Sequence, residues 1–424
     1  MCLTIPARVV SVSGREAEVL ESGKERSIDI SLLPRLKAGD WILHTTGLAI
    51  KKVSPKDAKD ILWLLEAAGK IDDNSLSERF RDMAQAARTR GLTKEEISYL
   101  LETDNPEEVD ALHSEANTIR KAYLKEFICV HGIIEFSNHC TKDCRYCGIM
   151  SGNSVKRYRM TIQEVVAVAL KSSEKGYKLL VLQSGEDPYY TDDILEEMIR
   201  TIKQHARVFI FLSIGERGYD SYRRLREAGA SGILLRFETS NPDLFRRLHP
   251  EGKDLDNRLS HIRFLKEMGY FIATGFMVGL PGQTIDDIAT DILTLQRLSP
   301  GMVSIGPFIP SPGTSFPGDA AGSTDITLRT MSILRLLMRS VRIPVTTALE
   351  TIGGVKMRKA GLMAGGNALM FNLTPPEYRL LYQIYPDRFY QRDRKWERYA
   401  LFQGRESFKM LESEILALLK EVTA

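Results

Sequence analysis

Cysteine is scarce in this sequence, and its few copies are unevenly spaced. Only five of the 424 residues are cysteines, an odd number, and three of them, Cys140, Cys144 and Cys147, fall within eight positions. This layout excludes a disulfide framework as the main source of stability and favours a metal site. It also indicates a reducing compartment.

Long apolar runs and an excess of one charge are absent as well. No run of 18 or more apolar residues occurs, and the beginning, MCLTIPARVV, has neither a basic segment nor an apolar one after it. We therefore expect a cytoplasmic protein with no membrane partner. The 58 basic and 55 acidic residues are mixed along the chain and leave a net charge of +3, so no nucleic-acid partner is predicted.

The sequence does contain enough apolar material for a folded chain of at least two domains. Hydrophobic residues make up 43% and charged residues 27%, the balance of a globular protein. Residues 1–53 alternate apolar and polar positions in short runs, which predicts a small all-β, OB-like barrel within a first domain of residues 1–70. The spacing then becomes helical, and residues 71–125 are expected to form a helical linker.

From Ile133 onward, compact apolar runs alternate with amphipathic segments, the pattern of repeated βα units. Eight such units predict an α/β fold, a (β/α)8 TIM barrel over residues 126–400, followed by a C-terminal helix over residues 401–424. Active sites of these barrels lie at the carboxyl ends of the strands. The strands are expected in IIEFS, KLLVLQS, RVFIFLS, GILLRFE, FIATGFMV, MVSIGPF, PVTTALE and ALMFNLT.

The strongest chemical signal is Cys140-x-x-x-Cys144-x-x-Cys147, directly after the first expected strand. Three thiolates can hold three corners of a cubic 4Fe-4S cluster and leave the fourth iron open for chemistry. The alternative is a structural zinc site, which normally needs a fourth Cys or His at metal spacing. The motif resembles that of radical S-adenosylmethionine (SAM) enzymes, in which the open iron binds S-adenosyl-L-methionine and an electron splits its sulfonium to give a 5′-deoxyadenosyl radical.

A second signal, Ser184-Gly185-Glu186-Asp187, follows the second expected strand. It resembles the glycine-and-acid motif with which radical SAM enzymes bind the methionyl ammonium of SAM. Glycine lets the backbone approach closely, and a carboxylate provides charge-assisted pairing. By themselves the four residues are typical of a helix-capping loop, so the functional interpretation depends on their place in the barrel.

Three charged residues at and after the fourth expected strand are candidates for the carboxylate and ribose of SAM. Arg236 and Glu238 alternate along the strand and face the same side, where two buried charges need each other or a ligand. Arg258 supplies a second guanidinium. The alternative is a structural ion pair near the mouth of the barrel.

The last two strands supply further candidates for the wall of the cavity. Thr346 and Thr347 lie on the seventh strand, and Tyr378, Tyr382 and Tyr385 follow the eighth. Packing in the core or a cap on the surface explains each of them equally well.

From Thr93 to Pro386 the chain resembles the FeFe-hydrogenase maturase family HydE, in segments such as IIEFSNHCTKDCRYCG, KRYRM, VLQSGEDPYY, LLRFETSNP and MVGLPGQTIDD. The resemblance implies a 4Fe-4S cluster, SAM, and radical attack on the cysteine sulfur of an Fe(CO)2(CN)-cysteine synthon, a small organometallic iron complex, during H-cluster maturation. It also implies HydG, HydF and a low-potential electron donor as partners. Carried over by position, the SAM contacts include Tyr146, Ser184, Glu238 and Arg258.

One departure from the HydE pattern concerns a second cluster. Some members hold an accessory iron-sulfur cluster on three further cysteines after the final YP motif, and this chain has none there. Only Cys2 and Cys129 remain unassigned, so no second protein-bound cluster is expected. Cys129 is predicted to be a buried thiol rather than a ligand.

The first domain resembles HypC, the small chaperone of NiFe-hydrogenase maturation, in its start MC, its IP pair and WILHTTGLAIKKV. The resemblance implies that Cys2 and His44 carry iron bearing cyanide and carbon monoxide, and a thiolate with an imidazole suits such iron. Thr45-Thr46 and Leu48 depart from the usual pattern. The alternative is a barrel that serves only for docking.

Two other functions stay open at this point. One is a radical SAM reaction on an amino acid or small organic substrate, as in relatives of methylornithine synthase or biotin synthase, although the biotin reaction needs more cysteines than remain here. The other is a scaffold that only carries a metal intermediate, which needs neither the three-cysteine motif nor a SAM pocket.

Overall fold

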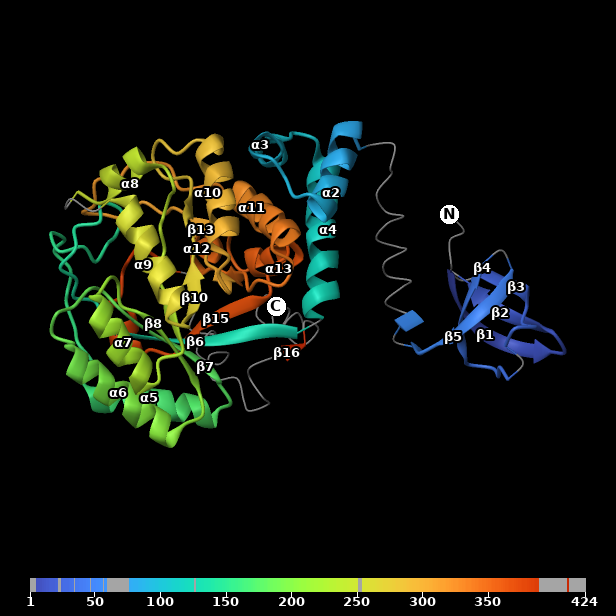
Figure 1. The fold of residues 1–424 in the computed structure, drawn as a ribbon, viewed down its shortest axis with the longest axis horizontal. Helices are drawn as coiled ribbons and strands as arrows, with labels where there is room; N and C mark the ends of the chain where they lie inside the picture. Colours follow the sequence, from blue (N-terminus) through green and yellow to red (C-terminus); the bar gives the residue numbers. More distant parts are fainter. Residues whose placement is uncertain are drawn as a thin grey trace. The chain divides into compact units, whose positions relative to one another are not determined.

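The computed structural model divides the chain into two compact units, residues 1–77 and 78–424, which are described separately (Figure 1). No helix among the described residues has both the length and the apolar character needed to cross a membrane. The structure describes residues 5–21, 24–33, 35–45, 47–55, 57–58, 76–125, 127–250, 254–388 and 410–411.

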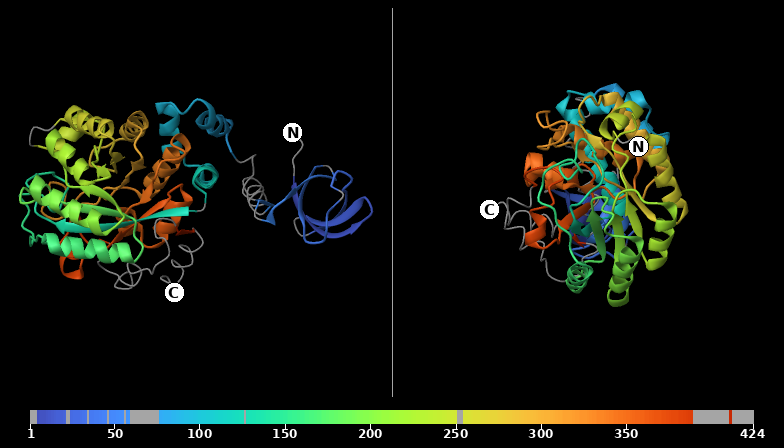
Figure 2. Two further views of the ribbon diagram at one scale, coloured as in Figure 1. Left: turned by 60° about the horizontal axis from the view of Figure 1, so that its bottom comes forward. Right: turned by 90° about the vertical axis from the view of Figure 1, so that its left-hand side faces the viewer.

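The first unit is a closed five-stranded barrel in the order β1-β2-β3-β5-β4, in which β4 pairs back with β1. All pairs are antiparallel except β3 with β5. The inward positions of the strands form its apolar core, which includes Val9, Val19 and Ile42, and the strands curl around it in the left-hand view of Figure 2. The expected small β-barrel is confirmed. Its strands are β1 (Ile5–Ser13), β2 (Glu16–Glu21), β3 (Lys24–Asp29), β4 (Trp41–Thr45) and β5 (Leu48–Val53).

The second unit contains the eight expected strands as one parallel sheet in the order β12-β10-β9-β8-β7-β6-β15-β14. An isolated parallel bridge between Met302 of β12 and Arg342, just before β14, nearly closes the barrel. The (β/α)8 fold is thereby confirmed. The strands are β6 (Phe127–Ser137), β7 (Leu179–Ser184), β8 (Phe209–Ser213), β9 (Gly232–Leu234), β10 (Phe271–Thr274), β12 (Met302–Val303), β14 (Pro344–Val345) and β15 (Ala368–Asn372), with a short extra pair β11 (Met277–Val278) and β13 (Gly306–Pro307).

Helices surround these strands in Figure 1. Several begin at polar caps that the sequence signals, including the capping boxes of Thr161 with Glu164 and of Thr284 with Asp287. The helices are α5 (Ile162–Glu174), α6 (Asp192–His205), α7 (Tyr219–Ala228), α8 (Pro242–Leu248), α9 (Leu255–Glu267), α10 (Ile285–Leu298), α11 (Thr324–Leu337), α12 (Thr347–Gly353), α13 (Lys356–Met363) and α14 (Pro376–Arg379).

The described part of segment 71–125 packs against the barrel as three helices, α2 (Glu78–Thr89), α3 (Lys94–Glu102) and α4 (Pro106–Leu124). His113 Nδ1 lies 2.8 Å from the Ser332 hydroxyl, and Arg329 donates to the Leu101 carbonyl at 3.0 Å. These helices therefore belong to the barrel unit. The expected C-terminal helix lies outside the described residues except at Met410–Leu411, which form strand β16 against β6.

Strand β6 begins at Phe127, earlier than the run IIEFS indicates, and so includes Cys129. This thiol is buried, as predicted, and its Sγ lies 3.2 Å from His131 Nε2. Apolar side chains such as Ile133, Val181 and Phe211 fill the middle of the barrel. The polar residues at the carboxyl ends of the strands lie directly above this apolar core.

Candidate active site

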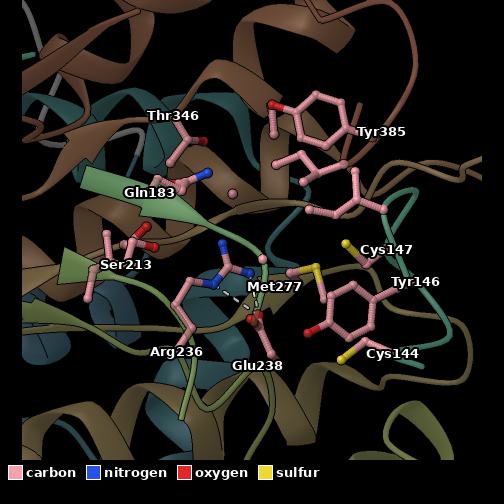
Figure 3. Close-up of a pocket in the computed structure, with 18 of the residues that line it drawn as sticks. Cys144, Tyr146, Cys147, Gln183, Ser213, Arg236, Glu238, Met277, Thr346 and Tyr385 are labelled. Atoms are coloured by element: carbon pink, nitrogen blue, oxygen red, sulfur yellow. Dashed lines mark hydrogen bonds and ion pairs between the residues drawn. The ribbon is translucent and has the colours of Figure 1, made fainter. Parts of the chain in front are cut away.

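A cavity of about 340 Å³ opens at the carboxyl ends of the barrel strands, where such enzymes place their active sites. Figure 3 shows side chains from several strands and from the cysteine loop pointing into it. Of the residues predicted for the site, the cavity wall includes Cys140, Cys144, Tyr146, Cys147, Ser184, Gly185, Glu186, Arg236, Glu238, Arg258, Thr346 and Thr347.

The three motif cysteines stand on the loop that leaves β6 after Ser137. Backbone hydrogen bonds shape this loop, from Cys147 N to the Cys144 carbonyl at 3.0 Å and from Gly148 N to the Ile384 carbonyl at 2.8 Å. Burial raises the pKa of the Cys140 thiol and raises that of Cys147 to about 12, so both thiols are neutral near pH 7 in the protein without metal.

This donor set fits an iron-sulfur cluster. Metal ions bring the charge that deprotonates buried thiols, and three thiolates can serve three separate corners of a cubane. Among the described parts of the chain, no three His, Cys, Asp or Glu side chains gather at the spacing of a single-ion site.

The segment Ser184–Glu186 closes against the cysteine loop. Gly185 N donates to the Ser137 carbonyl at 3.1 Å, and Thr141 N donates to the Glu186 carbonyl at 3.0 Å. A Cβ at Gly185 would stand 2.2 Å from the His139 carbonyl oxygen, so only glycine lets the two backbones approach this closely.

The structure does not bring Asp187 into the cavity. Its buried carboxylate accepts from the Ser137 hydroxyl at 2.7 Å and from Arg159 Nε at 2.8 Å. Although burial acts in the opposite direction, these hydrogen bonds leave the pKa of Asp187 below its usual value. The residue therefore holds the base of the loop.

Arg236 and Glu238 pair with each other at the cavity wall, with Arg236 Nε donating to Glu238 Oε2 at 2.9 Å (Figure 3). Glu238 has a φ of +64°, in the left-handed region that side chains other than glycine seldom adopt. Arg258 is buried behind them, where it pairs with Glu216 and donates to the Arg236 carbonyl. The chain thus presents both charge signs at one end of the cavity.

Tyr146 places its ring between the cysteine loop and Glu238 in Figure 3. Burial first, and then the charge of Glu238, raises its pKa well above the usual value, so the phenol stays neutral. Its hydroxyl lies 3.3 Å from His249 Nε2. His249 Nδ1 lies 2.9 Å from the Phe245 carbonyl, so the ring links Tyr146 to helix α8.

The opposite end of the cavity includes Thr346 and Thr347, as predicted, together with groups that the motifs did not signal. Gln183 Nε2 donates to the Tyr382 hydroxyl at 3.1 Å. Alternation along β7 could have indicated Gln183, which lies two positions after the inward Val181. Other unsignalled residues of the wall include Lys142, Ser213, Ser304, Met370 and Arg388.

Tyr378 does not line this cavity. Its hydroxyl donates to Glu164 Oε1 at 2.7 Å, and its ring stacks on Tyr158 with 5.0 Å between the ring centroids. Tyr382 and Tyr385, which follow it in the chain after the end of α14, do line the cavity.

In the first unit, the side chain of His44 is buried. Its Nε2 lies 3.3 Å from Glu21 Oε2, at ion-pair distance but without hydrogen-bond geometry. Nδ1 also has no hydrogen bond. Cys2 lies outside the described residues.

Comparison with family models defines the class of protein. Residues 134–295 match the Radical SAM superfamily, and residues 1–65 match the HupF/HypC family. The cysteine loop and cavity of the barrel are therefore those of a radical SAM enzyme, and the small barrel is a HypC-type domain.

The relatives narrow this class. The [FeFe] hydrogenase maturase subunit HydE of Thermotoga maritima is 42% identical over 311 residues, which are 73% of this chain and 88% of that protein. The 3-methylornithine synthase of Methanosarcina barkeri is 31% identical over 294 residues, 68% of this chain and 81% of that protein. The chain belongs to the HydE family of radical SAM enzymes.

Solved structures agree with the fold. The crystal structure of methylornithine synthase (PylB) has a TM-score of 0.66 at 25% identity and covers 79% of this chain and 99% of its own. The maturase HydG from Carboxydothermus hydrogenoformans has a TM-score of 0.64 at 20% identity, covering 86% and 83%. At that identity the second likeness concerns the fold alone.

Proposed function

We propose that this chain is a hydrogenase maturase that holds a 4Fe-4S cluster on Cys140, Cys144 and Cys147, cleaves SAM reductively, and attacks the cysteine sulfur of an Fe(CO)2(CN)-cysteine synthon. The observation that carries the proposal is that the three thiols and two further sets of polar groups open onto one cavity. Identity of 42% to a HydE maturase supports the choice of substrate.

When bound, the cluster supplies one electron to the sulfonium of SAM, which yields the 5′-deoxyadenosyl radical. The residues of this chain bind and orient. In this proposal Ser184 and Glu186 accept hydrogen bonds from the ammonium of SAM, and Arg258 provides the cation for its carboxylate. Glu238 is the acceptor for ribose hydroxyls, with Arg236 fixing its carboxylate through the 2.9 Å hydrogen bond.

The other end of the cavity suits the amino-acid part of the synthon. Thr346, Thr347 and the Gln183–Tyr382 pair offer hydroxyl and amide groups that can both donate and accept hydrogen bonds.

A second candidate is the rearrangement of lysine to 3-methylornithine. It is favoured by 31% identity to 3-methylornithine synthase and by the full coverage of the PylB structure. The two reactions differ in what occupies the end of the cavity near Thr346.

A parallel assay with the two substrates separates these candidates. The reconstituted, reduced chain with SAM is expected to form an adenosyl adduct with the HydG-made iron-cysteine synthon at a rate at least about 10-fold above that of any product from lysine. Mass spectrometry of both mixtures measures this. Appearance of 3-methylornithine without an adduct would assign the chain to the second candidate.

For the first unit, we propose that Cys2 and His44 hold the iron complex as cargo, before or after the reaction in the barrel, in exchange with HydG or HydF. The buried His44 ring with no hydrogen bond at either nitrogen supports this, since an imidazole needs a free nitrogen to bind iron. Covalent linkage of carrier and enzyme raises the local concentration to about the millimolar range where the linker lets the sites meet.

The substitution Cys2→Ala tests the carrier role. In the full chain it is expected to reduce maturation of apo-hydrogenase at limiting synthon several-fold, while SAM cleavage stays at the level of the unmodified chain. Ser11→Ala, an exposed substitution in the first unit, serves as the matched control. Equal maturation by the Cys2→Ala and unmodified chains would remove the carrier role and leave the barrel reaction untouched.

A further inference from the structure

Arg157 follows the cysteine motif in the chain, and its guanidinium donates four hydrogen bonds to backbone carbonyls. Nη1 donates to Asn138 at 2.6 Å and to Ile149 at 2.8 Å, while Nη2 donates to Met150 at 2.7 Å and to Asn153 at 3.0 Å. No side-chain carboxylate takes part in these contacts.

The four carbonyls flank the cysteine loop on both sides. Asn138 stands immediately before the loop, and residues 149–153 immediately follow Cys147 and Gly148. One planar group therefore joins the two ends of the segment that carries all three thiols. A guanidinium has five N–H donors spread over three nitrogens in a fixed plane. The three donors of a lysine ammonium all belong to one nitrogen, so they cannot span both ends of the cysteine loop.

Arg157 is itself held from both sides. Tyr158 N donates to Asn138 Oδ1 at 2.7 Å, and Asn138 Nδ2 donates to the Lys156 carbonyl at 2.8 Å. The same segment continues alongside β6, where Met160 N donates to the Phe136 carbonyl at 2.8 Å. The clamp is thus built from the protein's own hydrogen bonds.

The same hydrogen bonds fix the positive charge of Arg157 beside the cysteine loop, between Asn138 and Ile149. A fixed positive charge and hydrogen bonding around an iron-sulfur cluster both shift its reduction potential, and a cation favours the more negative, reduced state.

We propose that Arg157 is a positioning residue for the iron-sulfur cluster: its guanidinium clamps the cysteine loop in the shape that accepts the cluster, and its charge eases reduction of that cluster. The inference rests on the proposed function in one respect, that Cys140, Cys144 and Cys147 hold a cluster.

The test uses Arg157→Lys, which keeps the charge without the fork, and Arg157→Met, which keeps neither. Arg329→Lys is the matched control, because Arg329 also donates to two backbone carbonyls, of Leu101 at 3.0 Å and Thr103 at 2.6 Å, but joins α3 to α11 away from the cavity. Iron and sulfide content, the rate of cluster loss to a chelator, and a redox titration followed by electron paramagnetic resonance are measured on each full chain. Circular dichroism and thermal melting report folding.

Both Arg157 variants are expected to lose the cluster about 10-fold faster than the unmodified chain and the Arg329→Lys control, the cost typical of an outer-shell partner. The potential of the remaining cluster becomes more negative in Arg157→Met and stays near that of the unmodified chain in Arg157→Lys. Folded Arg157 variants that retain the cluster as long as the control, or an unchanged potential in Arg157→Met, would overturn the inference alone. An unmodified chain that binds no cluster would overturn it together with the proposed function.

Discussion

Replacement of Cys147 by alanine is expected to reduce bound iron to background and to abolish formation of 5′-deoxyadenosine from SAM. Cys147 is one of the three thiols on the cavity wall, and among the described residues no fourth cysteine lines that wall to replace it. Loss of an outer-shell partner already costs roughly 10–100-fold in metal affinity or activity, so loss of a ligand exceeds that range. Iron analysis, the visible absorption of the cluster and chromatography of the nucleoside product measure the effect.

Cys129→Ala is the matched control for this experiment. Cys129 likewise forms no disulfide and is buried, but it lies on the strand β6 with its Sγ 3.2 Å from His131 and outside the cavity wall. The control is expected to lose some stability, on the order of 1 kcal/mol, and to keep cluster and activity. Full iron content in the Cys147→Ala chain, or loss of the cluster in the control alone, would contradict the assigned ligand set.

Gly185→Ala is the second substitution with a large expected effect. The added Cβ would stand 2.2 Å from the His139 carbonyl oxygen and 2.7 Å from Cys140 Cβ, where ordinary contacts begin near 3.4 Å. Because the first obstacle is backbone, the cysteine loop has to move by about an ångström, and a displacement of that size can cost about 100-fold in rate. We expect reconstituted iron and the rate of SAM cleavage to fall together.

Gly318→Ala controls for the loss of a glycine. A Cβ at Gly318 meets no atom within 4 Å, so this chain should behave like the unmodified one in both assays. If the Gly185→Ala chain took up the cluster and cleaved SAM at the unmodified rate, the close approach of the two loops would have no functional meaning.

The arrangement of the barrel could be predicted from sequence because its signals are local. Apolar runs of strand length mark each β-strand, and the strand order of a (β/α)8 barrel follows the chain. The cysteine loop could also be predicted from sequence, because Cys140, Cys144 and Cys147 are close in the chain and directly follow a strand. Strand alternation predicted that Arg236 and Glu238 face the same side, and the structure pairs them. The prediction that both lie on the fourth strand was wrong, because β9 ends at Leu234 and Glu238 has a φ of +64°.

The residues that the motifs did not locate depend on contacts between distant segments. Asp187 continues the Ser184–Glu186 motif, yet its carboxylate turns away to Ser137 and Arg159. No local sequence pattern predicts that Asp187 pairs with Ser137 and Arg159 instead of facing the cavity. The clamp of Arg157 could not be predicted from sequence either. All four of its acceptors are backbone carbonyls, which any residue type provides.

Arg388 shows the same limit over a longer distance. It lines the cavity and donates through Nη2 to Glu135 Oε1 at 2.6 Å, 253 positions earlier in the chain. Tyr378 was expected beside the cavity because it follows the last strand, but the chain turns once more before Tyr382 and Tyr385 reach the wall. Position after a strand predicts the correct end of the barrel, and only packing decides which side chain enters the cavity.

The most direct test of the central claim is whether the reduced, cluster-loaded full chain cleaves SAM. Anaerobic reconstitution with iron and sulfide, reduction, and addition of SAM should give 5′-deoxyadenosine, or its adduct where the synthon is supplied, with equal methionine, and none of these in the Cys147→Ala chain. A fully loaded chain that returns SAM intact under the same conditions, with and without synthon, would contradict the claim and leave a protein that only carries a metal.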